Sequence, residues 1–587
     1  MLTINDMKNP VNIFLKRILV LVLLLAAERG AAQGFLDVKG KDIINEKGEK
    51  VILRGMGLGG WMLQEGYMLR MPGDGQQHRI RARIEEVMGS ERTREFYDSW
   101  LKNHTTRADI DSMKAWGFNS VRLPMHYNLY TLPVEEEPVR GRNTWLERGF
   151  AMTDSLLAWC KANQMYLILD MHAAPGGQGN DFNISDRDPS KPSLWESEEN
   201  RNKMIALWRK LAERYAGEPW IGAYDIINEP NWGFTDPEDR NGLKEPHNGP
   251  LKQLMVDITR AIRDVDQKHI IIIEGNGWGN NYNGILPPWD KKMVLSFHKY
   301  WNFNNPESIA HFIRLRDQYN VPVWLGETGE NSNTWFTEAI ALMESNGIGW
   351  CWWPLKKMGF NNPLEIRVTP GYEDLLRYWA GTGPRPSAEA AYATMMQMAE
   401  NSRLENCIIH ADVIDAMFRQ VRSAETRPFR RHHVREAIQA VDYDLGRNRS
   451  AYFDTDTSEH YISTGTARTG WNSGRTYRND GVDIARGKED GNYFVTKTED
   501  GEWLQYTVSA DAPGRYTMAI RVSAAGSGGR LSVSANGQDL AAVAVTGSGE
   551  NWQDVTVKNV LLRKGPNQIR LRIEKGGFNL ASFRFAR

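Results

Sequence analysis

Short apolar runs alternate with amphipathic stretches from about residue 34 to residue 380. Eight of these runs have the length of buried strands, and they cover residues 51–57, 120–123, 165–170, 222–227, 270–274, 293–297, 321–325 and 348–353. Stretches between them, such as 107–116 and 199–215, are long enough for crossover helices. Eight alternating units in about 350 residues predict an α/β fold, the (β/α)8 TIM barrel. An open doubly wound sheet is the alternative, but no glycine-rich phosphate-binding turn follows the first strand.

The pattern changes near residue 437. Beyond it, runs with period-two alternation are separated by Gly, Asn and Asp, and they cover 502–508, 515–523, 530–535, 553–562, 568–574 and 578–585. This texture predicts a separate all-β sandwich (jelly-roll) domain over 437–587. We therefore expect a barrel domain over 34–400 and a helical linker over 401–436, in which the basic cluster 427–433 is a solvated joint between the domains.

The N-terminus has the pattern of a secretory signal peptide. Lys8, Lys16 and Arg17 precede the apolar run 18–27, and small residues at 30–32 follow it. We expect residues 1–32 to be removed and the mature protein to be secreted or periplasmic. The apolar run is too short to span a bilayer, so no membrane partner is expected after signal removal.

Composition narrows the classes of function. The 587 residues are 41% hydrophobic and carry a formal net charge of -1, which gives no electrostatic reason to expect nucleic acid as a partner. The 21 tryptophans offer flat rings that suit stacking on sugars as well as core packing. Cys160, Cys351 and Cys407 are too scattered to indicate a disulfide framework or a metal site, so we expect them to be buried thiols.

Polar residues follow the predicted strands where a barrel would bring them to one face. These residues are Arg122, His172, Asn228, Glu229, His298, Tyr300, Glu327 and Trp353. Two carboxylates in such a setting can cleave a glycosidic bond, because one donates a proton to the leaving oxygen while the other attacks the anomeric carbon. Glu274 and Asp170 also lie near strand ends, and periodicity alone rates Glu274 as highly as Glu229.

Several ordered motifs carry a resemblance to a known family. They are Arg54-Gly-Met-Gly-Leu-Gly-Gly-Trp61, Arg122-Leu-Pro, Asp170-Met-His-Ala-Ala-Pro-Gly, Ile227-Asn-Glu-Pro, Phe297-His-Lys-Tyr300, Leu325-Gly-Glu327 and Trp350-Cys-Trp-Trp-Pro-Leu-Lys. Together they resemble glycoside hydrolase family 5 over roughly residues 35–380. The resemblance implies a retaining β-glycanase with Glu229 as acid/base and Glu327 as nucleophile.

The same resemblance implies roles for the other strand-tip residues. It assigns Asn228 to the sugar 2-hydroxyl, Arg122 and Tyr300 to the nucleophile, and His172, His298 and Trp353 to the sugar subsite closest to cleavage. Strand alternation lets only one of Trp352 and Trp353 face the cavity, so Trp352 is the alternative to Trp353. The run 59–61 with Glu65, and the loop 176–181, resemble family members acting on β-glucans more than those acting on mannans.

The C-terminal region resembles carbohydrate-binding module family 6. The motifs are Gly491-Asn-Tyr493, Asp500-Gly-Glu-Trp-Leu-Gln-Tyr506, Asn551-Trp552-Gln553 and Phe578-Asn579-Leu580. The resemblance implies that Tyr493 and Trp552 sandwich a sugar and that Asn579 bonds to it. Trp503 lies on an alternating strand and is predicted to be a core residue. The family's calcium-binding acid falls at Val441 or Asp442, a departure that argues against a structural calcium ion.

We therefore expect a glycoside hydrolase that cleaves β-glucan by double displacement with two glutamates and needs no cofactor. An endo-β-1,4-glucanase is the first expectation, with β-linked polysaccharide or oligosaccharide as the partner. A β-1,3-glucanase or an exo-β-glucosidase on the same fold is one alternative. A non-catalytic polysaccharide-binding protein is another. Nothing in the sequence indicates the oligomeric state.

Overall fold

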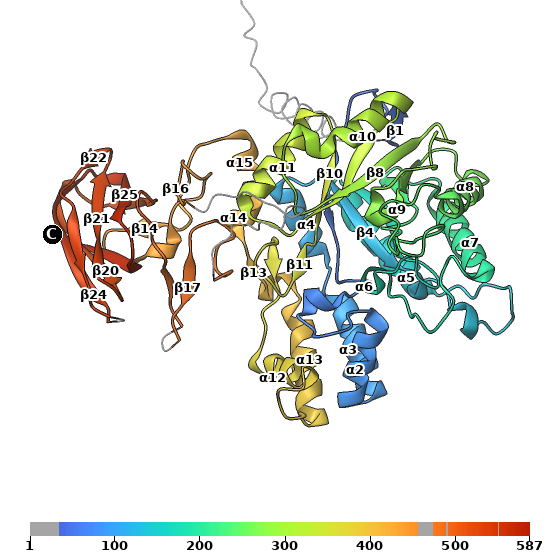
Figure 1. Ribbon diagram of the computed structural model, residues 1–587, viewed down its shortest axis with the longest axis horizontal. Helices are drawn as coiled ribbons and strands as arrows, with labels where there is room; N and C mark the ends of the chain where they lie inside the picture. Colours follow the sequence, from blue (N-terminus) through green and yellow to red (C-terminus); the bar gives the residue numbers. More distant parts are fainter. Residues whose placement is uncertain (1–33, 456–473, 489–490, 550) are drawn as a thin grey trace, which may run out of the picture.

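The computed structural model describes residues 34–455, 474–488, 491–549 and 551–587, and Figure 1 shows a barrel joined to a β-sandwich. Eight parallel strands close in the order β10-β3-β4-β5-β6-β7-β8-β9, which confirms the predicted TIM barrel. The strands are β3 (Arg54–Gly57), β4 (Ser120–His126), β5 (Tyr166–Ala173), β6 (Ile221–Asp225), β7 (Ile270–Glu274), β8 (Met293–Lys299), β9 (Val323–Gly329) and β10 (Trp350–Trp353). A small hairpin of β1 (Asp37–Lys39) and β2 (Asp42–Ile44) precedes the barrel.

The barrel strands are buried nearly throughout, because helices cover their outer faces. β7, with four isoleucines before Glu274, is the plainest example. The longer helices around the barrel are α4 (Arg107–Trp116), α5 (Glu147–Ala162), α7 (Glu198–Tyr215), α8 (Gly249–Arg263), α10 (Pro306–Tyr319) and α11 (Asn333–Ser345), and α6 (Phe182–Ser185) and α9 (Asn276–Gly279) are short. The three cysteines are free and buried, as expected.

Four further helices form a lobe beside the barrel, at the bottom of Figure 1. They are α2 (Gln77–Met88), α3 (Ser90–Asn103), α12 (Pro370–Trp379) and α13 (Ala388–Asn401), and α13 packs against both α2 and α3. The Tyr372 hydroxyl of α12 donates to the Leu69 carbonyl at 2.8 Å. This bond ties the lobe to the 3-10 helix η1 (Gly66–Leu69), which stands beside the mouth of the barrel.

The predicted linker packs on the barrel and is only partly helical. It contains β13 (Ile408–Ile409), which pairs with β12 (Leu364–Glu365), itself paired with β11 (Lys356–Lys357). α14 (Ala411–Met417) and α15 (Arg419–Arg422) follow and contact α11, where the Thr337 hydroxyl donates to the Ala416 carbonyl at 2.9 Å. β14 (His432–His433) already pairs with β19 (Trp503–Ala510) of the sandwich, so the sandwich begins before the predicted boundary at residue 437.

The sandwich consists of two sheets around their own core, and their strands pair antiparallel except for β14, which pairs parallel with β19. One sheet holds β14, β16 (Tyr452–Phe453), β19 (Trp503–Ala510), β21 (Gly528–Ala535), β22 (Gln538–Asp539), β23 (Val543–Thr546) and β25 (Gly565–Lys575). The other holds β15 (Ile438–Gln439), β17 (Ile484–Arg486), β18 (Tyr493–Val495), β20 (Gly514–Ser523), β24 (Gln553–Leu562) and β26 (Asn579–Ala586). The all-β prediction is confirmed.

The prediction that Trp503 is a core residue is wrong. Leu504, Tyr506 and Val508 of β19 face the core, so alternation places Trp503 on the outer face, where it is only half-buried. The guanidinium of Arg570 covers its ring at 3.8 Å. The stacked arginine and the polar outer face together explain how a tryptophan sits outside the core.

The predicted signal peptide, residues 1–32, lies outside the described residues, so the expected location outside the cytoplasm stays a prediction. Among the described helices, none combines the length and the apolar content that crossing a bilayer requires.

Candidate active site

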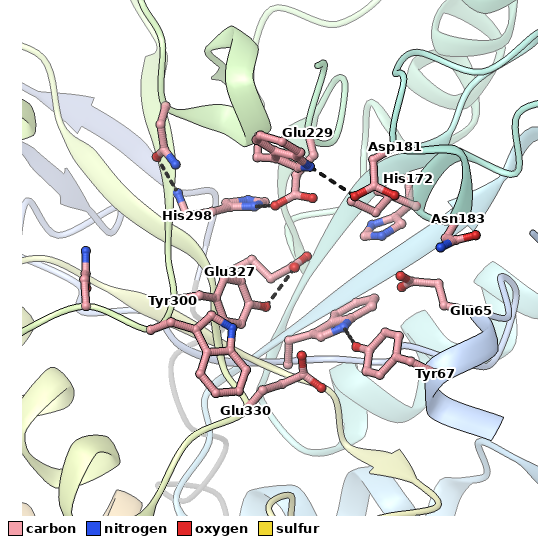
Figure 2. A pocket seen from close by; sticks show the side chains of 16 residues that line it. Glu65, Tyr67, His172, Asp181, Asn183, Glu229, His298, Tyr300, Glu327 and Glu330 are labelled. Carbon is pink, nitrogen blue, oxygen red and sulfur yellow. Dashed lines mark hydrogen bonds and ion pairs between the residues drawn. The ribbon is translucent and has the colours of Figure 1, made fainter. Parts of the chain in front are cut away.

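A cavity of about 590 Å³ opens at the carboxyl ends of the barrel strands (Figure 2). The predicted residues that line it are His172, Glu229, His298, Tyr300, Glu327 and Trp353, and loop residues complete the wall. Arg122 and Asn228 are not among the lining residues, and both are fully buried with bonds to residues that are. The predicted strand-tip residues therefore gather in one place.

Arg122, from β4, is the hub beneath the cavity. Its Nε donates to Asp225 at 2.9 Å, and its Nη1 donates to Glu327 Oε2 at 2.8 Å. Its Nη2 donates to the Asn228 side-chain oxygen at 2.8 Å and to Glu274 at 3.2 Å. A planar guanidinium with donors in a fixed fork can satisfy several acceptors at once. Arg122 thereby fixes the carboxylate of one candidate catalytic residue and the amide next to the other.

The cluster around Arg122 holds more carboxyl groups than cations. Burial raises the pKa of Asp170 and of Asp225 well above the usual value, although Arg122 opposes the shift. Burial also acts to raise the pKa of Glu274, but His298 and Arg122 outweigh it and leave that pKa below its usual value. Glu274 is thus an ionised anchor in the floor of the site.

Glu229 follows β6 in a left-handed backbone conformation, with φ at 43°. Its backbone N–H donates to Glu274 at 2.7 Å, and its carboxyl Oε1 lies 2.6 Å from His298 Nδ1. Burial raises the pKa of Glu229 to about 7, with the neighbouring His298 opposing the rise. A strained non-glycine residue whose carboxyl group is protonated near neutral pH is a feature of functional sites.

His298 stands between two carboxylates. Its other ring nitrogen, Nε2, lies 3.1 Å from Glu274. Burial acts to lower the pKa of His298, but Glu274 and Glu229 raise it well above the usual value. The imidazole is therefore protonated and donates to both carboxyl groups.

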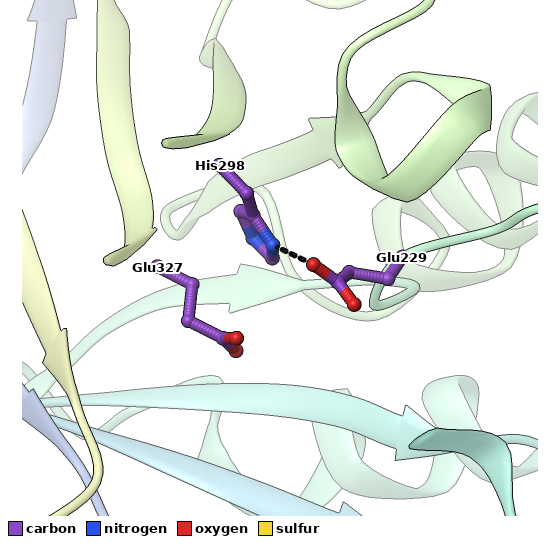
Figure 3. Close-up of side chains that lie close together, drawn as sticks. All are labelled: Glu229, His298 and Glu327. Atoms are coloured by element: carbon purple, nitrogen blue, oxygen red, sulfur yellow. Dashed lines mark hydrogen bonds and ion pairs between the residues drawn. The ribbon is translucent and has the colours of Figure 1, made fainter. Parts of the chain in front are cut away.

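Glu327, in β9, is held from two sides. Arg122 binds one carboxylate oxygen, and the Tyr300 hydroxyl donates to the other at 2.9 Å. One atom each of Glu229, His298 and Glu327 lie within 4.8 Å of one another (Figure 3). Over the described parts of the chain, this is the one set of three His, Cys, Asp or Glu side chains close enough to share a cation. Its acidic members are the two predicted catalytic residues.

His172 and Trp353 form the opposite wall. Their rings are stacked, with centroids 5.0 Å apart and planes 7° apart. His172 Nδ1 lies 2.7 Å from Asp170, its Nε2 lies 3.3 Å from the Asn228 amide nitrogen, and burial lowers its pKa to about 3. The neutral ring therefore donates to Asp170 and accepts from Asn228. Trp353 Nε1 donates to the Tyr67 hydroxyl at 2.9 Å.

The structure distinguishes the two neighbouring tryptophans. Trp353 lines the cavity, whereas Trp352 is 1% exposed and packs edge-on against Phe336. Their opposite directions follow from strand alternation.

Several cavity residues escaped the sequence reasoning because they lie in the connections that follow the barrel strands, some of them in the short helices η1, α6 and α9, and not in the strand-tip motifs. They are Tyr67, Asn183, Ile184, Trp278, Asn280, Trp301, Asn302 and Glu330. The sequence could have indicated Trp278, because this tryptophan lies between two glycines shortly after β7. Glu65 and Asp181, noted only within the resemblance to β-glucan enzymes, also line the cavity. Burial, and next the charge of Glu327, raises the pKa of Glu65 well above its usual value.

The sandwich has a smaller hollow of about 180 Å³ that contains two of its three predicted sugar-binding residues. Tyr493 and Trp552 line it together with Phe494 and Arg521, and the Trp552 ring meets Phe494 edge-on at 5.4 Å. Asn579 is not among the lining residues. Its side chain instead accepts from Thr496 at 2.8 Å and donates to Ser523 at 3.2 Å within the sandwich.

Asp442, one of the two positions considered for the family's calcium ligand, is engaged by other groups. Its carboxylate accepts from Arg430 Nε at 3.1 Å and from the Tyr477 hydroxyl. An arginine bound to this carboxylate competes with any cation that would use it.

Comparison with known families agrees with the geometry. Residues 81–359 match the family described as cellulase (glycosyl hydrolase family 5). The barrel belongs to glycosyl hydrolase family 5. Residues 474–587 match the family 6 carbohydrate-binding module, so the sandwich is a family 6 module. Both resemblances inferred from the sequence motifs are confirmed. Membership of the barrel in family 5 places it among the glycoside hydrolases.

Relatives of the family 5 domain carry different activities in their names. A β-xylosidase of Phanerodontia chrysosporium is 27% identical over 379 residues, which cover 58% of this chain and 75% of that protein. Endoglucanase C of Acetivibrio thermocellus is 28% identical over 233 residues, covering 39% of this chain and 59% of that protein. A probable glucan 1,3-beta-glucosidase A of Aspergillus clavatus is 26% identical over 290 residues, covering 49% and 64%. The chain thus spans less than two thirds of the latter two relatives.

Proposed function

We propose that this protein is a secreted, retaining glycoside hydrolase that cleaves β-linked glucan with Glu229 as acid/base and Glu327 as nucleophile. The observation that carries the proposal is the 4.8 Å limit on the separation between an oxygen of Glu229 and an oxygen of Glu327. Retaining enzymes hold their two carboxyl groups about 5–5.5 Å apart, and inverting enzymes about 6.5–9.5 Å apart.

The surroundings of the two glutamates support these separate roles. Burial keeps Glu229 protonated below about pH 7, as a proton donor requires. Arg122 and Tyr300 each bind one oxygen of Glu327, which fixes where a nucleophilic oxygen points. Glu327 attacks the anomeric carbon while Glu229 protonates the leaving oxygen. Glu229 then takes a proton from the water that releases the sugar from Glu327.

Neighbouring groups position the sugar. Arg122 occupies the side-chain oxygen of Asn228, which turns the amide N–H groups toward His172 and the sugar 2-hydroxyl. Trp353 and His172 offer flat surfaces against which the ring packs. His298 supports Glu229 from the far side and keeps its carboxyl group in place through the catalytic cycle.

For the substrate and the mode of cleavage, we favour endo action on β-1,4-glucan. The match to the cellulase family and the relationship to an endoglucanase of Acetivibrio thermocellus support it.

Exo action is a second candidate, favoured by two hydrogen bonds that join neighbouring segments beside the cavity. Gly75 N–H donates to Asn183 at 3.0 Å, and His78 N–H donates to Asp186 at 2.8 Å. These bonds join the segment after β3 and the start of α2 to the loop after β5, whose Asn183 lines the cavity together with Glu65 (Figure 2). A wall on this side would limit how far a chain extends past the cleavage point. The relationship to a probable glucan 1,3-beta-glucosidase A fits the same candidate.

The products released from a panel of β-1,4, β-1,3 and mixed-linkage glucans, xyloglucan and mannan test the assignment. We expect oligomers from β-1,4 or mixed-linkage glucan. Release of glucose alone would replace the endo assignment with the exo candidate. Binding without any hydrolysis would favour the non-catalytic polysaccharide-binding protein.

Glu229→Gln should lower kcat on natural glucans by about 10²-fold or more while polysaccharide binding persists. The wild-type kcat/KM should fall as the pH rises through about 7, because Glu229 then loses the proton that it must donate. The variant should lack this decline. Glu65→Gln, which changes another buried carboxyl group of the cavity, is the control and should keep it. A decline that persists in Glu229→Gln would remove Glu229 as the acid.

Glu327→Ala should reduce turnover of an aryl β-glucoside by about 10⁴-fold. Azide should restore part of the rate and yield an α-glycosyl azide, because the small anion fits where the carboxylate stood. Glu330→Ala, also in the cavity wall, should show no azide rescue. Wild-type rates in Glu327→Ala would end its assignment as nucleophile.

Trp552→Ala should weaken pull-down by insoluble polysaccharide about tenfold, since a buried aromatic anchor dominates such contacts. Trp503→Ala removes a tryptophan from the outer face of β19 and serves as the matched control. Equal retention of both variants would place the binding face of the module elsewhere.

A further inference from the structure

A buried polar cluster joins the family 6 module to the barrel at the first turn of α11. Asn331 and Asn333 come from the barrel, Asp412 from α14, and Asn479 and Asp480 from the module. None of these five residues is more than 2% exposed. The module residues of this cluster fall inside the region that matches the family 6 module, so they belong to the module itself.

The bonds of this cluster run directly between the domains. Asn479 donates through its side chain to the Asn331 carbonyl at 2.8 Å and to Asn333 Oδ1 at 3.0 Å. Its carbonyl accepts from the Asn333 backbone N–H at 2.9 Å. The Asn333 side chain donates to Asp480 at 3.0 Å and to Asp412 at 2.9 Å, and Asp412 accepts from the Asn479 backbone N–H at 2.7 Å.

The other carboxyl oxygen of Asp480 is bonded within the module. This oxygen accepts from Arg478 Nη2 at 2.8 Å and from the Tyr443 hydroxyl at 3.1 Å. Domains of one chain usually meet through modest polar interfaces and move relative to each other. Buried polar groups that lose their partners are costly, so this cluster holds the module in one position against the barrel.

The barrel side of the cluster continues into the catalytic cavity. Asn331 directly follows Glu330, which lines the cavity, and Glu327 lies three residues before Glu330. Glu330 has φ at 52° and pairs with Lys357 at 2.5 Å. The backbone that Asn479 holds is therefore the continuation of β9, the strand that carries the candidate nucleophile.

A second connection runs from the same turn of α11 to the loop after β8. Trp335 Nε1 donates to the Asn302 carbonyl at 2.7 Å, and the Trp335 carbonyl accepts from Asn304 at 3.1 Å. Lys299 lies 4.7 Å from the centre of the Trp335 ring. Trp301 and Asn302, in this loop after β8, line the cavity. One helical turn thus contacts two of the segments that line the cavity.

We propose that Asn479 of the family 6 module is a positioning residue for the catalytic cavity, acting through Asn331, Asn333 and the first turn of α11. This positioning role is separate from the binding of polysaccharide by the module. Because of it, the module is also needed for the hydrolysis of short soluble substrates. The expected effect on kcat/KM rests on the proposed hydrolase function. The expected effect on hydrogen exchange in the cavity loops does not depend on that function.

Kinetics of the full-length Asn479→Ala variant on a soluble aryl β-cellobioside test the proposal. The main-chain bonds of Asn479 remain, so the fold is kept and circular dichroism should match the wild type. We expect kcat/KM to fall about tenfold, mostly in kcat, because displaced catalytic groups lower the rate steeply. Hydrogen exchange should become faster in residues 299–305 and 328–337.

Asn567→Ala is the matched control. Asn567 is 1% exposed and bonds within the same module, to the Arg563 and Gly565 carbonyls. This variant should lower the melting temperature and leave kcat/KM and exchange at 299–305 and 328–337 unchanged. Asn333→Ala, which opens the cluster from the barrel side, should reproduce the Asn479→Ala effect.

Wild-type kcat/KM and wild-type exchange in folded Asn479→Ala would overturn the proposal. If the wild type hydrolyses no glycoside, the proposed function fails, and the exchange measurement alone then decides whether the module supports the cavity.

Discussion

The candidate active site depends on the hydrogen bonds and ion pairs of the buried Arg122 guanidinium. The guanidinium binds carboxyl or amide oxygens from the ends of β6, β7 and β9, three strands far apart in the sequence. Removing one partner of a buried ion pair leaves an uncompensated charge, so such a hub also fixes the positions of its neighbours. The barrel brings the strand ends together, and Arg122 sets the arrangement of the side chains they carry.

The excess of acid around this hub determines which carboxyl groups hold protons. Glu274 contacts His298 and Arg122, and these two groups lower its pKa, while burial raises the pKa of Glu229 to about 7. His298 touches both, so it couples the ionised floor of the site to the protonated group above it. Two glutamates at similar strand ends thus differ in chemistry because of depth and partners.

This difference marks how far the sequence could go. Strand periodicity predicted the barrel and placed the tip residues on one face. It rated Glu274 and Glu229 equally, because the alternation of apolar and polar residues does not tell how far below the cavity a side chain lies. Alternation alone could not say which of Trp352 and Trp353 faces the cavity, and it gave the wrong face for Trp503, because two faces of a strand look alike until the core is known. Tyr67 and Glu330 lie on loops whose paths depend on distant partners such as Tyr372 and Lys357.

The buried cluster at α11 has a consequence for how this architecture can diverge. Binding modules on flexible tethers can be exchanged by recombination at the tether, because neither domain completes the other. Here a foreign module would leave the polar groups of Asn331 and Asn333 buried against a surface that had not evolved to bond them. A replacement module would therefore need its own equivalents of Asn479 and Asp480 to pack against this barrel without leaving buried polar groups unpaired.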